Sequence, residues 1–552
     1  MRPLYGIWIF FTIKRILFTS QKYAPVVKWI SQRSSEPLLG VRIPPGAQNK
    51  GIFCGFHMKF AIPKEVLNIT ETLQNNGFEA YVVGGSVRDL IMGREPKDWD
   101  VTTNATPETI QNLFSRTVYE NTFGTVGVVT DVDDAILDQK PESLRVVEVT
   151  PYRTEGEYID SRHPESVTFV SSLEEDLARR DFTINAIAYN PGDDSIKDPF
   201  EGKKDIKDKI IRTVGDANIR FSEDALGLMR AIRFSAQLNF SLELETQKAI
   251  SELHMKLKNV SVERIRDEFV KILLSDSPML GLFVCNALGL LQYFLPELEK
   301  GVHVKQNQAH SFDVWGHNLR TCQHAADKKW SLDLRLAGLF HDIAKPHTRR
   351  WSKEKNDYTF HGHEVVGGKV TREIMSRMKF SREMIDKVST LVRWHMFFSD
   401  TEQITLSAVR RIVANVGEEN IWDLMNLRIC DRIGTGRPKE NPYRFRKYKA
   451  MVEQALRDPI SVKMLKINGV EIMSVTHETP GPKIGYILHI LLEDVLEDPK
   501  NNTFEYLSDK AKQLIVLDVN DLKIRAEKGK IKKDELEESE VKRLHMKHNV
   551  SM

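Results

Sequence analysis

The sequence contains little cysteine, and no two of its cysteines lie close together. The four are Cys54, Cys285, Cys322 and Cys430 among 552 residues, without a C-x-x-C pair. Neither a disulfide framework nor a zinc site built from thiolates is therefore expected. This usage predicts a reducing, cytoplasmic environment. Long apolar runs are also missing, so we expect no membrane span.

An excess of charge of one sign is missing as well. Lys and Arg number 79 against 77 Asp and Glu, which gives a net charge of +2. This charge does not identify a nucleic-acid partner, so any RNA-binding surface would have to come from local clustering. Apolar residues make up 41% and charged residues 28% of the chain, as in soluble globular proteins. The length predicts three or four domains, and no obligate protein partner is evident.

The first 57 residues differ in composition from the rest. They hold eight Lys and Arg, one Glu and no Asp, behind an aromatic start that is typical of organellar transit peptides. We favour another interpretation. Val41-Arg42-Ile43-Pro44 is what G-T-T-C-G-A-A-T-C-C encodes, and that run looks like the T-arm of a transfer RNA gene. We therefore expect spurious upstream translation and a native start near Met58, which would leave a net charge of −5.

The pattern of apolar residues changes once along the rest of the chain. Residues 58–205 alternate between helical and strand patterns, including a strand at Ala80–Val83, which predicts an α+β region. Beyond residue 205 the strand signals fade and helices are expected up to a charged tail. One of these helices is predicted at Asp224–Gln237.

A Gly-Gly turn with two nearby aspartates is the main chemical feature. Gly84 and Gly85 follow an apolar strand pattern, and Arg88 lies three residues on. Asp98 and Asp100 are two residues apart, so on a strand they would point to the same face. Convergent carboxylates beside a turn that can bind phosphate are what two divalent metals need for nucleotidyl transfer.

Two further segments carry groups suited to a nucleotide. Arg180, Asp181 and Asn185 combine a guanidinium, a carboxylate and an amide, and such groups suit triphosphate oxygens and ribose hydroxyls. The alternative is a helix start with a surface salt bridge. Downstream, Asp224 and Arg230 lie three residues either side of Gly227, which predicts that all three share one helix face.

Five ordered motifs carry a family resemblance. GGSVRD, DWD, RRDFTINA, DPFEG and EDALGLMRAIRF resemble, in order and spacing, the class II tRNA nucleotidyltransferases, which comprise CCA-adding enzymes and related bacterial poly(A) polymerases. The resemblance covers roughly residues 60–300. It implies an α+β, polymerase-β-like nucleotidyltransferase head over 58–205 and an all-α neck over 206–300. The implied activity is addition of CMP and AMP, from CTP and ATP, to the tRNA 3′ end. A poly(A) polymerase is the close alternative.

The resemblance also implies roles for single residues. Asp98 and Asp100 would bind two Mg²⁺ ions that activate the RNA 3′-hydroxyl and clamp the triphosphate. Asp181 would read the ribose hydroxyls, and Asp224 the base. Glu148 is a candidate third carboxylate near the metals. The resemblance further implies a set of residues that contact the phosphates or other parts of the nucleotide, or that pack around these contacts. They are Gly84, Gly85, Arg88, Arg180, Asn185, Arg230 and Arg233.

The neck motif departs from the family pattern at one position. The family's E-D-x-x-R presents an Asp and an Arg to the Watson–Crick edge of the incoming base, whereas Gly227 stands here in place of the Arg. Loss of a bidentate contact costs about 1–3 kcal/mol of base discrimination. We therefore predict a relaxed or altered choice between CTP and ATP, unless water or a neighbouring side chain compensates.

A second set of metal-ligand residue types lies in residues 301–450. His317, His341, Asp342 and Asp431 resemble the H…HD…D pattern of the HD phosphohydrolase superfamily, and His363 and His395 match the extra positions of its two-metal members. Imidazoles with carboxylates suit Mn²⁺, Ni²⁺ or Fe²⁺, which generate a nucleophilic hydroxide. The implied activity is hydrolysis of phosphomonoesters or cyclic phosphodiesters, for example at damaged RNA 3′ ends.

Two alternatives to these interpretations remain open. The HD domain could be a retained helical scaffold that only holds RNA. The whole chain could be an HD phosphohydrolase or an RNA-binding protein with an altered head. Residues 451–552 are expected to form a helical, tRNA-contacting region with a charged tail.

Overall fold

The computed structural model describes residues 60–119, 124–131, 133–155, 167–307, 311–397, 404–457 and 462–526. The predicted N-terminal extension 1–57, the start at Met58 and the charged tail beyond 526 lie outside these ranges. Contacts divide the chain into two compact units. The first extends to Ile272 and includes Phe283–Tyr293, and the second consists of Leu273–Leu282 and the chain from Phe294 onward.

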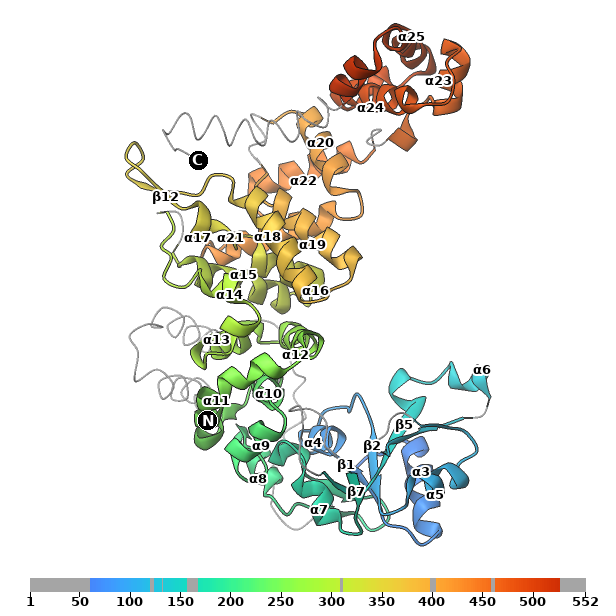
Figure 1. Ribbon diagram of the computed structural model, residues 1–552, viewed down its shortest axis with the longest axis vertical. Helices are drawn as coiled ribbons and strands as arrows, with labels where there is room; N and C mark the ends of the chain where they lie inside the picture. Colours follow the sequence, from blue (N-terminus) through green and yellow to red (C-terminus); the bar gives the residue numbers. More distant parts are fainter. Residues whose placement is uncertain are drawn as a thin grey trace, which may run out of the picture. The chain divides into compact units, whose positions relative to one another are not determined.

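The first unit is built on a mixed sheet (Figure 1). Its strands within the described residues are β1 (Ala80–Val83), β2 (Asp100–Thr103), β3 (Thr117–Tyr119), β4 (Val126–Val129), β5 (Val146–Pro151), β8 (Ala188–Asn190) and β9 (Ser195–Lys197). They are ordered β3-β4-β5-β2-β1-β8-β9. Only the β2–β5 pair of this sheet is parallel. Its register sets Asp100 opposite Glu148, at the start of β2.

Helices cover this sheet through regularly spaced apolar side chains. Helices α3 (Lys64–Asn75) and α5 (Pro107–Leu113) pack against the sheet strands and each other. Val66, Ile69 and Leu73 of α3 are buried, at the three- and four-residue spacing of one helix face. The smaller elements of the head are α4 (Gly85–Ile91), α6 (Asp134–Leu137), α7 (Leu173–Ala178), α8 (Gly202–Asp208), β6 (Arg153–Glu155) and β7 (Val167–Phe169).

The neck is helical, as predicted, apart from the short strands β10 (Ile210–Ile211) and β11 (Ser241–Leu242). Its helices are α9 (Ala217–Glu223), α10 (Gly227–Leu238), α11 (Leu244–Leu253), α12 (Val262–Leu274) and α13 (Pro278–Ala287).

The helix predicted at Asp224–Gln237 is wrong at its start. Asp224 has φ −126° and ψ 103°, and its Oδ1 accepts the Leu226 N–H at 3.0 Å. This bond between a side chain and the backbone competes with helix formation and separates α9 from α10. Asp224 therefore does not share a helix face with Gly227, which is the first residue of α10 and not an interior one.

The second unit is almost entirely helical. Its helices include α14 (Pro296–Glu299), α15 (Val314–Asp327), α16 (Leu332–Phe340), α17 (Lys345–Thr348), α18 (His363–Arg377), α19 (Arg382–Trp394), α20 (Leu406–Val416), α21 (Ile421–Gly434), α22 (Tyr443–Ala455), α23 (Gly469–Thr476), α24 (Pro482–Glu497) and α25 (Phe504–Ile515). A hairpin of β12 (Arg350–Ser352) and β13 (Asp357–Thr359) precedes α18. The predicted α+β class is confirmed. Within the described residues, no helix has both the length and the apolar character needed to cross a membrane.

Candidate nucleotide and metal sites

The turn between β1 and α4 requires glycine at its first position. Gly84 has φ +82°, a conformation that side chains with a Cβ rarely adopt. A Cβ on Gly84 would lie 3.0 Å from Nη1 of Arg180 and 3.5 Å from Oδ2 of Asp100. The missing side chain therefore lets a guanidinium and a carboxylate approach the turn closely.

This turn opens onto a cavity of about 780 Å³ in the first unit, a size that suits a small-molecule ligand. Asp100 begins β2, whereas Asp98 lies in the bend before the strand, so the predicted strand geometry holds for only one of the two. The predicted residues that line the cavity are Gly84, Gly85, Arg88, Asp98, Asp100, Arg180, Asp181, Asn185, Asp224 and Arg230, and Glu148 and Gly227 line it with them.

Arg233 is the predicted nucleotide residue that the structure does not place on this cavity. Its side chain is buried, and it pairs with Glu268 of α12 and donates to Gln237. The guanidinium also lies 3.9 Å from the ring centroid of Phe234. Arg233 thus takes part in the helix packing behind the cavity, one of the two roles considered for it.

Hydrogen bonds hold several cavity residues in fixed orientations. Arg88 donates from Nη1 to Asn185 at 2.7 Å. Asp181 accepts from Nε of Arg230 at 2.7 Å and from the Phe182 N–H at 2.8 Å. Burial alone would raise the pKa of Asp181, but the charge of Arg230 and the hydrogen bonds from Arg230, Asn185 and the Phe182 N–H together outweigh it and lower that pKa below its ordinary value. Asp181 therefore stays ionised while it positions Arg230.

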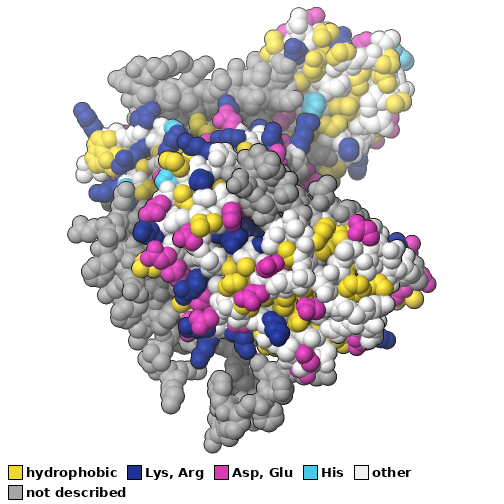
Figure 2. Space-filling view, turned by 60° about the horizontal axis from the view of Figure 1, so that its bottom comes forward, with side chains coloured by type: hydrophobic (Ala, Val, Ile, Leu, Met, Phe, Trp, Pro, Cys, Tyr) yellow, Lys and Arg dark blue, Asp and Glu magenta, His cyan; other side chains and the backbone are white. Residues whose placement is uncertain are grey.

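Acidic groups gather at the sheet end of the cavity, and they suit a divalent cation. Burial raises the pKa of Asp100, Arg180 opposes this shift, and the neighbouring Asp98 adds to it. Converging carboxylates repel each other unless a cation lies between them, and Mg²⁺ prefers such oxygen ligands. Glu148 lies beside them through the β2–β5 register. On the face drawn in Figure 2, Lys and Arg side chains form a group near the middle of the view, with Asp and Glu side chains around it.

Several lining residues of this cavity were missed by the sequence reasoning, and two of them lie beside the neck motif. Arg264 of α12 donates from Nη2 to Asp224 Oδ2 at 3.1 Å, and Phe221 of α9 packs beside Gly227. No signal in the sequence separates Arg264 from Arg266, because both flank Ile265 in one helix. The buried Phe221 reads as an ordinary core residue.

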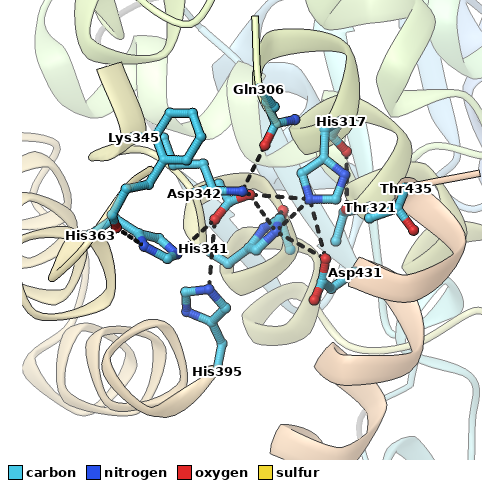
Figure 3. Close-up of polar contacts among 12 residues, drawn as sticks. Gln306, His317, Thr321, His341, Asp342, Lys345, His363, His395, Asp431 and Thr435 are labelled. Atoms are coloured by element: carbon cyan, nitrogen blue, oxygen red, sulfur yellow. Dashed lines mark hydrogen bonds and ion pairs between the residues drawn. The ribbon is translucent and has the colours of Figure 1, made fainter. Parts of the chain in front are cut away.

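A second cluster of polar side chains lies between helices of the second unit (Figure 3). The predicted ligands come from α15, the end of α16, α18, the end of α19 and α21. They form two groups, and within each group the ligand atoms lie within 4.8 Å of one another. One group is His317, His341 and Asp431, and the other is Asp342, His363 and His395.

Asp342 connects the two groups through its two oxygens. Oδ2 lies 3.2 Å from Nε2 of His317 and 3.3 Å from Nε2 of His341. Oδ1 lies 3.2 Å from Nε2 of His363 and 3.6 Å from Nε2 of His395. A carboxylate in this position can bridge two cations, each of which would also take two imidazoles.

The backbone fixes the tautomers of three of these histidines. Nδ1 of His341, His363 and His395 each lies 2.6–2.9 Å from a carbonyl oxygen three residues earlier in the chain. Because a carbonyl only accepts, each Nδ1 carries the proton, and in the neutral ring Nε2 presents a lone pair. Lone pairs aimed at the Asp342 carboxylate are the arrangement that a metal requires. The residues therefore fit a metal site.

Burial and charge act differently on the histidines. Burial lowers the pKa of His395 to about 4, against the opposing effect of Asp342. Burial also disfavours the charged form of His317, but its hydrogen bonds with Asp342 and Asp431 outweigh this and raise its pKa to about 9. Asp342 and Asp431 have pKa values well below the ordinary range despite their burial.

Two cations beside this cluster were not among the predicted site residues. Lys345 Nζ lies 2.6 Å from Asp342 Oδ2, and Arg428 donates to Asp431 Oδ2 at 2.6 Å. Lys345 follows Asp342 by three residues, and Arg428 precedes Asp431 by three. This is the spacing of ion pairs on one helix turn, and it could have indicated both cations. Both line a cavity of about 1180 Å³ that reaches four of the predicted ligands, Asp342, His363, His395 and Asp431.

Comparison with known proteins extends over both units. The "Poly A polymerase head domain" family matches residues 80–212, the "Probable RNA and SrmB- binding site of polymerase A" family matches 239–301, and the HD domain family matches 314–433. A CCA-adding enzyme of Leuconostoc mesenteroides is 33% identical over 447 residues, which are 79% of this chain and 95% of that protein. The chain belongs to the CCA-adding enzyme family. This confirms the resemblance that the motifs carried.

Other CCA-adding enzymes agree with this assignment. The enzyme of Lactobacillus helveticus is 47% identical over 209 residues, so the matched segment spans 38% of this chain and about half, 49%, of that protein. The Bacillus stearothermophilus CCA-adding enzyme in complex with CTP superposes with a TM-score of 0.61 at 27% identity, covering 82% of this chain and 96% of that one. The Thermotoga maritima CCA-adding enzyme complexed with tRNA shares the fold, with a TM-score of 0.50 at 20% identity, 82% of this chain and 96% of that one.

Proposed function

We propose that the protein adds C and A residues to the 3′ end of tRNA, without a template, from CTP and ATP. The observation that carries this proposal is the shared cavity of about 780 Å³ in the first unit, in which Asp98 and Asp100 face the space also lined by Arg180, Asp181 and Asp224. Membership of the CCA-adding enzyme family supports it, and a relative above 25% identity is known in complex with CTP.

Asp98 and Asp100 would hold two Mg²⁺ ions at the sheet end of the cavity. Bound there, the ions would supply Lewis-acid stabilisation of the phosphoryl oxygens and activation of the RNA 3′-hydroxyl. The Gly84 turn leaves room for phosphate oxygens next to Arg180, whose guanidinium lies close to it. Arg88 and Arg230 line the same space in orientations fixed by Asn185 and Asp181.

The deciding experiment supplies purified protein with tRNA that lacks its terminal CCA and with one labelled nucleotide at a time. Addition of C followed by A supports the proposal. Long A tails would instead indicate a poly(A) polymerase, and no extension at all would contradict both. Asp100→Asn should abolish extension, whereas Asp138→Asn, at an exposed residue that does not line the cavity, should not.

We also propose a phosphohydrolase activity for the second unit, on phosphomonoesters or cyclic phosphodiesters such as those at damaged RNA 3′ ends. The observation that favours it is Asp342, whose oxygens lie 3.2 Å from imidazoles of both ligand groups. Mn²⁺, Ni²⁺ or Fe²⁺ held there would polarise a phosphate oxygen and lower the pKa of a water molecule. Lys345 and Arg428 would offset the negative charge of a phosphate at the cavity wall.

This second activity is tested by phosphate release, after loading with Mn²⁺ or Ni²⁺, from p-nitrophenyl phosphate, a 2′,3′-cyclic nucleotide and an RNA with a 3′-phosphate. Release that is lost in Asp342→Asn supports the proposal. Release from none of the three substrates, by protein that retains metal, would indicate that these helices serve as a scaffold. We also propose a cytoplasmic location, because both proposed activities would act on cellular RNA.

A further inference from the structure

The neck offers an arginine that can take the place of the one missing at Gly227. Gly227 contributes no side-chain donor to the cavity, although it lines it together with Asp224. Arg264, from the separate helix α12, lines the same cavity and bonds to Asp224. We propose that Arg264 supplies the hydrogen-bond donors that read the base of the incoming nucleotide beside Asp224. This inference rests on the proposed nucleotide addition.

Asp224 is held in place as the acceptor of such a pair. Its Oδ1 accepts the Leu226 N–H at 3.0 Å, and its Oδ2 lies 3.1 Å from Nη2 of Arg264. Each carboxylate oxygen can accept more than one hydrogen bond, so both retain capacity for a ligand. The ion pair therefore orients Asp224 without exhausting its acceptors.

The other arginines around the neck end of the cavity are committed elsewhere. Arg230 gives Nε and Nη2 to Asp181. Arg220 gives Nη1 and Nη2 to the carbonyls of residues 179 and 178 and to Glu223. Arg264, by contrast, uses only Nη2 in its contacts with described residues, so Nε and Nη1 remain available to a ligand.

The chemistry of this pair predicts which bases it accepts. Cytosine and adenine both present an amino donor next to a ring-nitrogen acceptor, whereas uracil and guanine present a carbonyl acceptor next to an N–H donor. A carboxylate beside a guanidinium matches the first pattern and opposes the second. At the end of the cavity formed by the sheet, the carboxylates would hold the metal ions that bind the triphosphate. The end formed by the neck helices is then left for the base. The Asp224–Arg264 pair thus selects CTP and ATP against UTP and GTP.

The test compares kcat and KM for all four nucleotides on tRNA lacking CCA, in the full chain. Arg264→Ala removes the donors, and Arg264→Lys keeps the charge next to Asp224 but loses the planar fork. In both variants the preference for CTP over UTP, and for ATP over GTP, should fall about 5- to 150-fold. Arg266→Ala is the matched control, because Arg266 lies two residues away, pairs with Asp267 and does not line the cavity.

Two results would overturn the role of Arg264. A purely structural ion pair predicts unchanged base preference in Arg264→Lys, and it predicts an equal loss for all four nucleotides in Arg264→Ala. If Arg264→Ala fails to fold, the ratio measured for Arg264→Lys decides alone. Unmodified protein that adds no nucleotide would overturn the proposed function itself, whereas C and A addition with unchanged ratios would overturn only this inference.

Discussion

Asp100 and Glu148 lie opposite each other on the parallel strands β2 and β5, and both line the cavity of the first unit. Alternation along β5 buries Val147 and Val149 and turns Glu148 outward. The two residues lie far apart in the sequence, and the pairing of β2 with β5 brings their carboxylates together. This relationship makes Glu148 a third acidic group for the metals proposed at Asp98 and Asp100.

Glu148→Gln should lower nucleotide addition about 10- to 100-fold and raise the Mg²⁺ concentration needed for half-maximal rate. The amide keeps the size of the side chain but removes the charge that would help to hold the cations. Single-nucleotide addition over a Mg²⁺ titration measures both effects. Glu142→Gln, at an exposed residue outside the cavity, is the control. A variant with an unchanged rate and Mg²⁺ dependence would show that Glu148 does not help to hold the cations.

Asp342→Asn should strip metal from the second unit and leave nucleotide addition intact. The amide loses the charge that faces four imidazoles, so affinity for Mn²⁺ or Ni²⁺ should fall at least about 10- to 100-fold. Metal analysis after dialysis, together with C addition to tRNA, measures the two outcomes. The exposed His347, outside both ligand groups, provides His347→Asn as a control that should retain metal. Full metal content in Asp342→Asn would contradict a bridging carboxylate.

Local pattern was enough for part of this architecture. The strand Ala80–Val83 was predicted with its bounds, because apolar residues followed by two glycines leave few alternatives. Which histidines and aspartates would meet in the second unit came from the resemblance to the HD phosphohydrolase superfamily, and the structure does bring all six together. The break at Asp224 was missed because the three-residue spacing to Gly227 reads as helix, and the bond from the Leu226 N–H to the side chain of Asp224 leaves no periodic trace. Arg264 was missed because only tertiary packing distinguishes it from Arg266.

Acid should weaken the fold through the Asp181–Arg230 pair. Because the pKa of Asp181 is lowered in the folded state, its contribution is present above the unfolded value of about 3.9 and is lost as the pH falls through the folded value. Asp181→Asn should cost about 1–3 kcal/mol at pH 7 and make stability less dependent on pH below about 4. Urea unfolding between pH 3 and 7 tests this, with the exposed Asp267→Asn as control. Equal acid sensitivity in Asp181→Asn and unmodified protein would contradict it.

Gly227→Ala and Gly485→Ala should change stability in opposite directions. A Cβ on Gly227 would lie 3.0 Å from Cδ1 and 3.3 Å from Cε1 of the fully buried Phe221, whereas a Cβ on Gly485, within α24, would meet nothing within 4 Å. Alanine gains up to about 1 kcal/mol over glycine in a helix, but overpacking a core costs about 1–3 kcal/mol. We therefore expect Gly227→Ala to lose about 1 kcal/mol and Gly485→Ala to gain about 0.5–1 kcal/mol. Thermal unfolding of the two variants measures the signs, and a stabilising Gly227→Ala would mean that Phe221 can move aside to admit a Cβ.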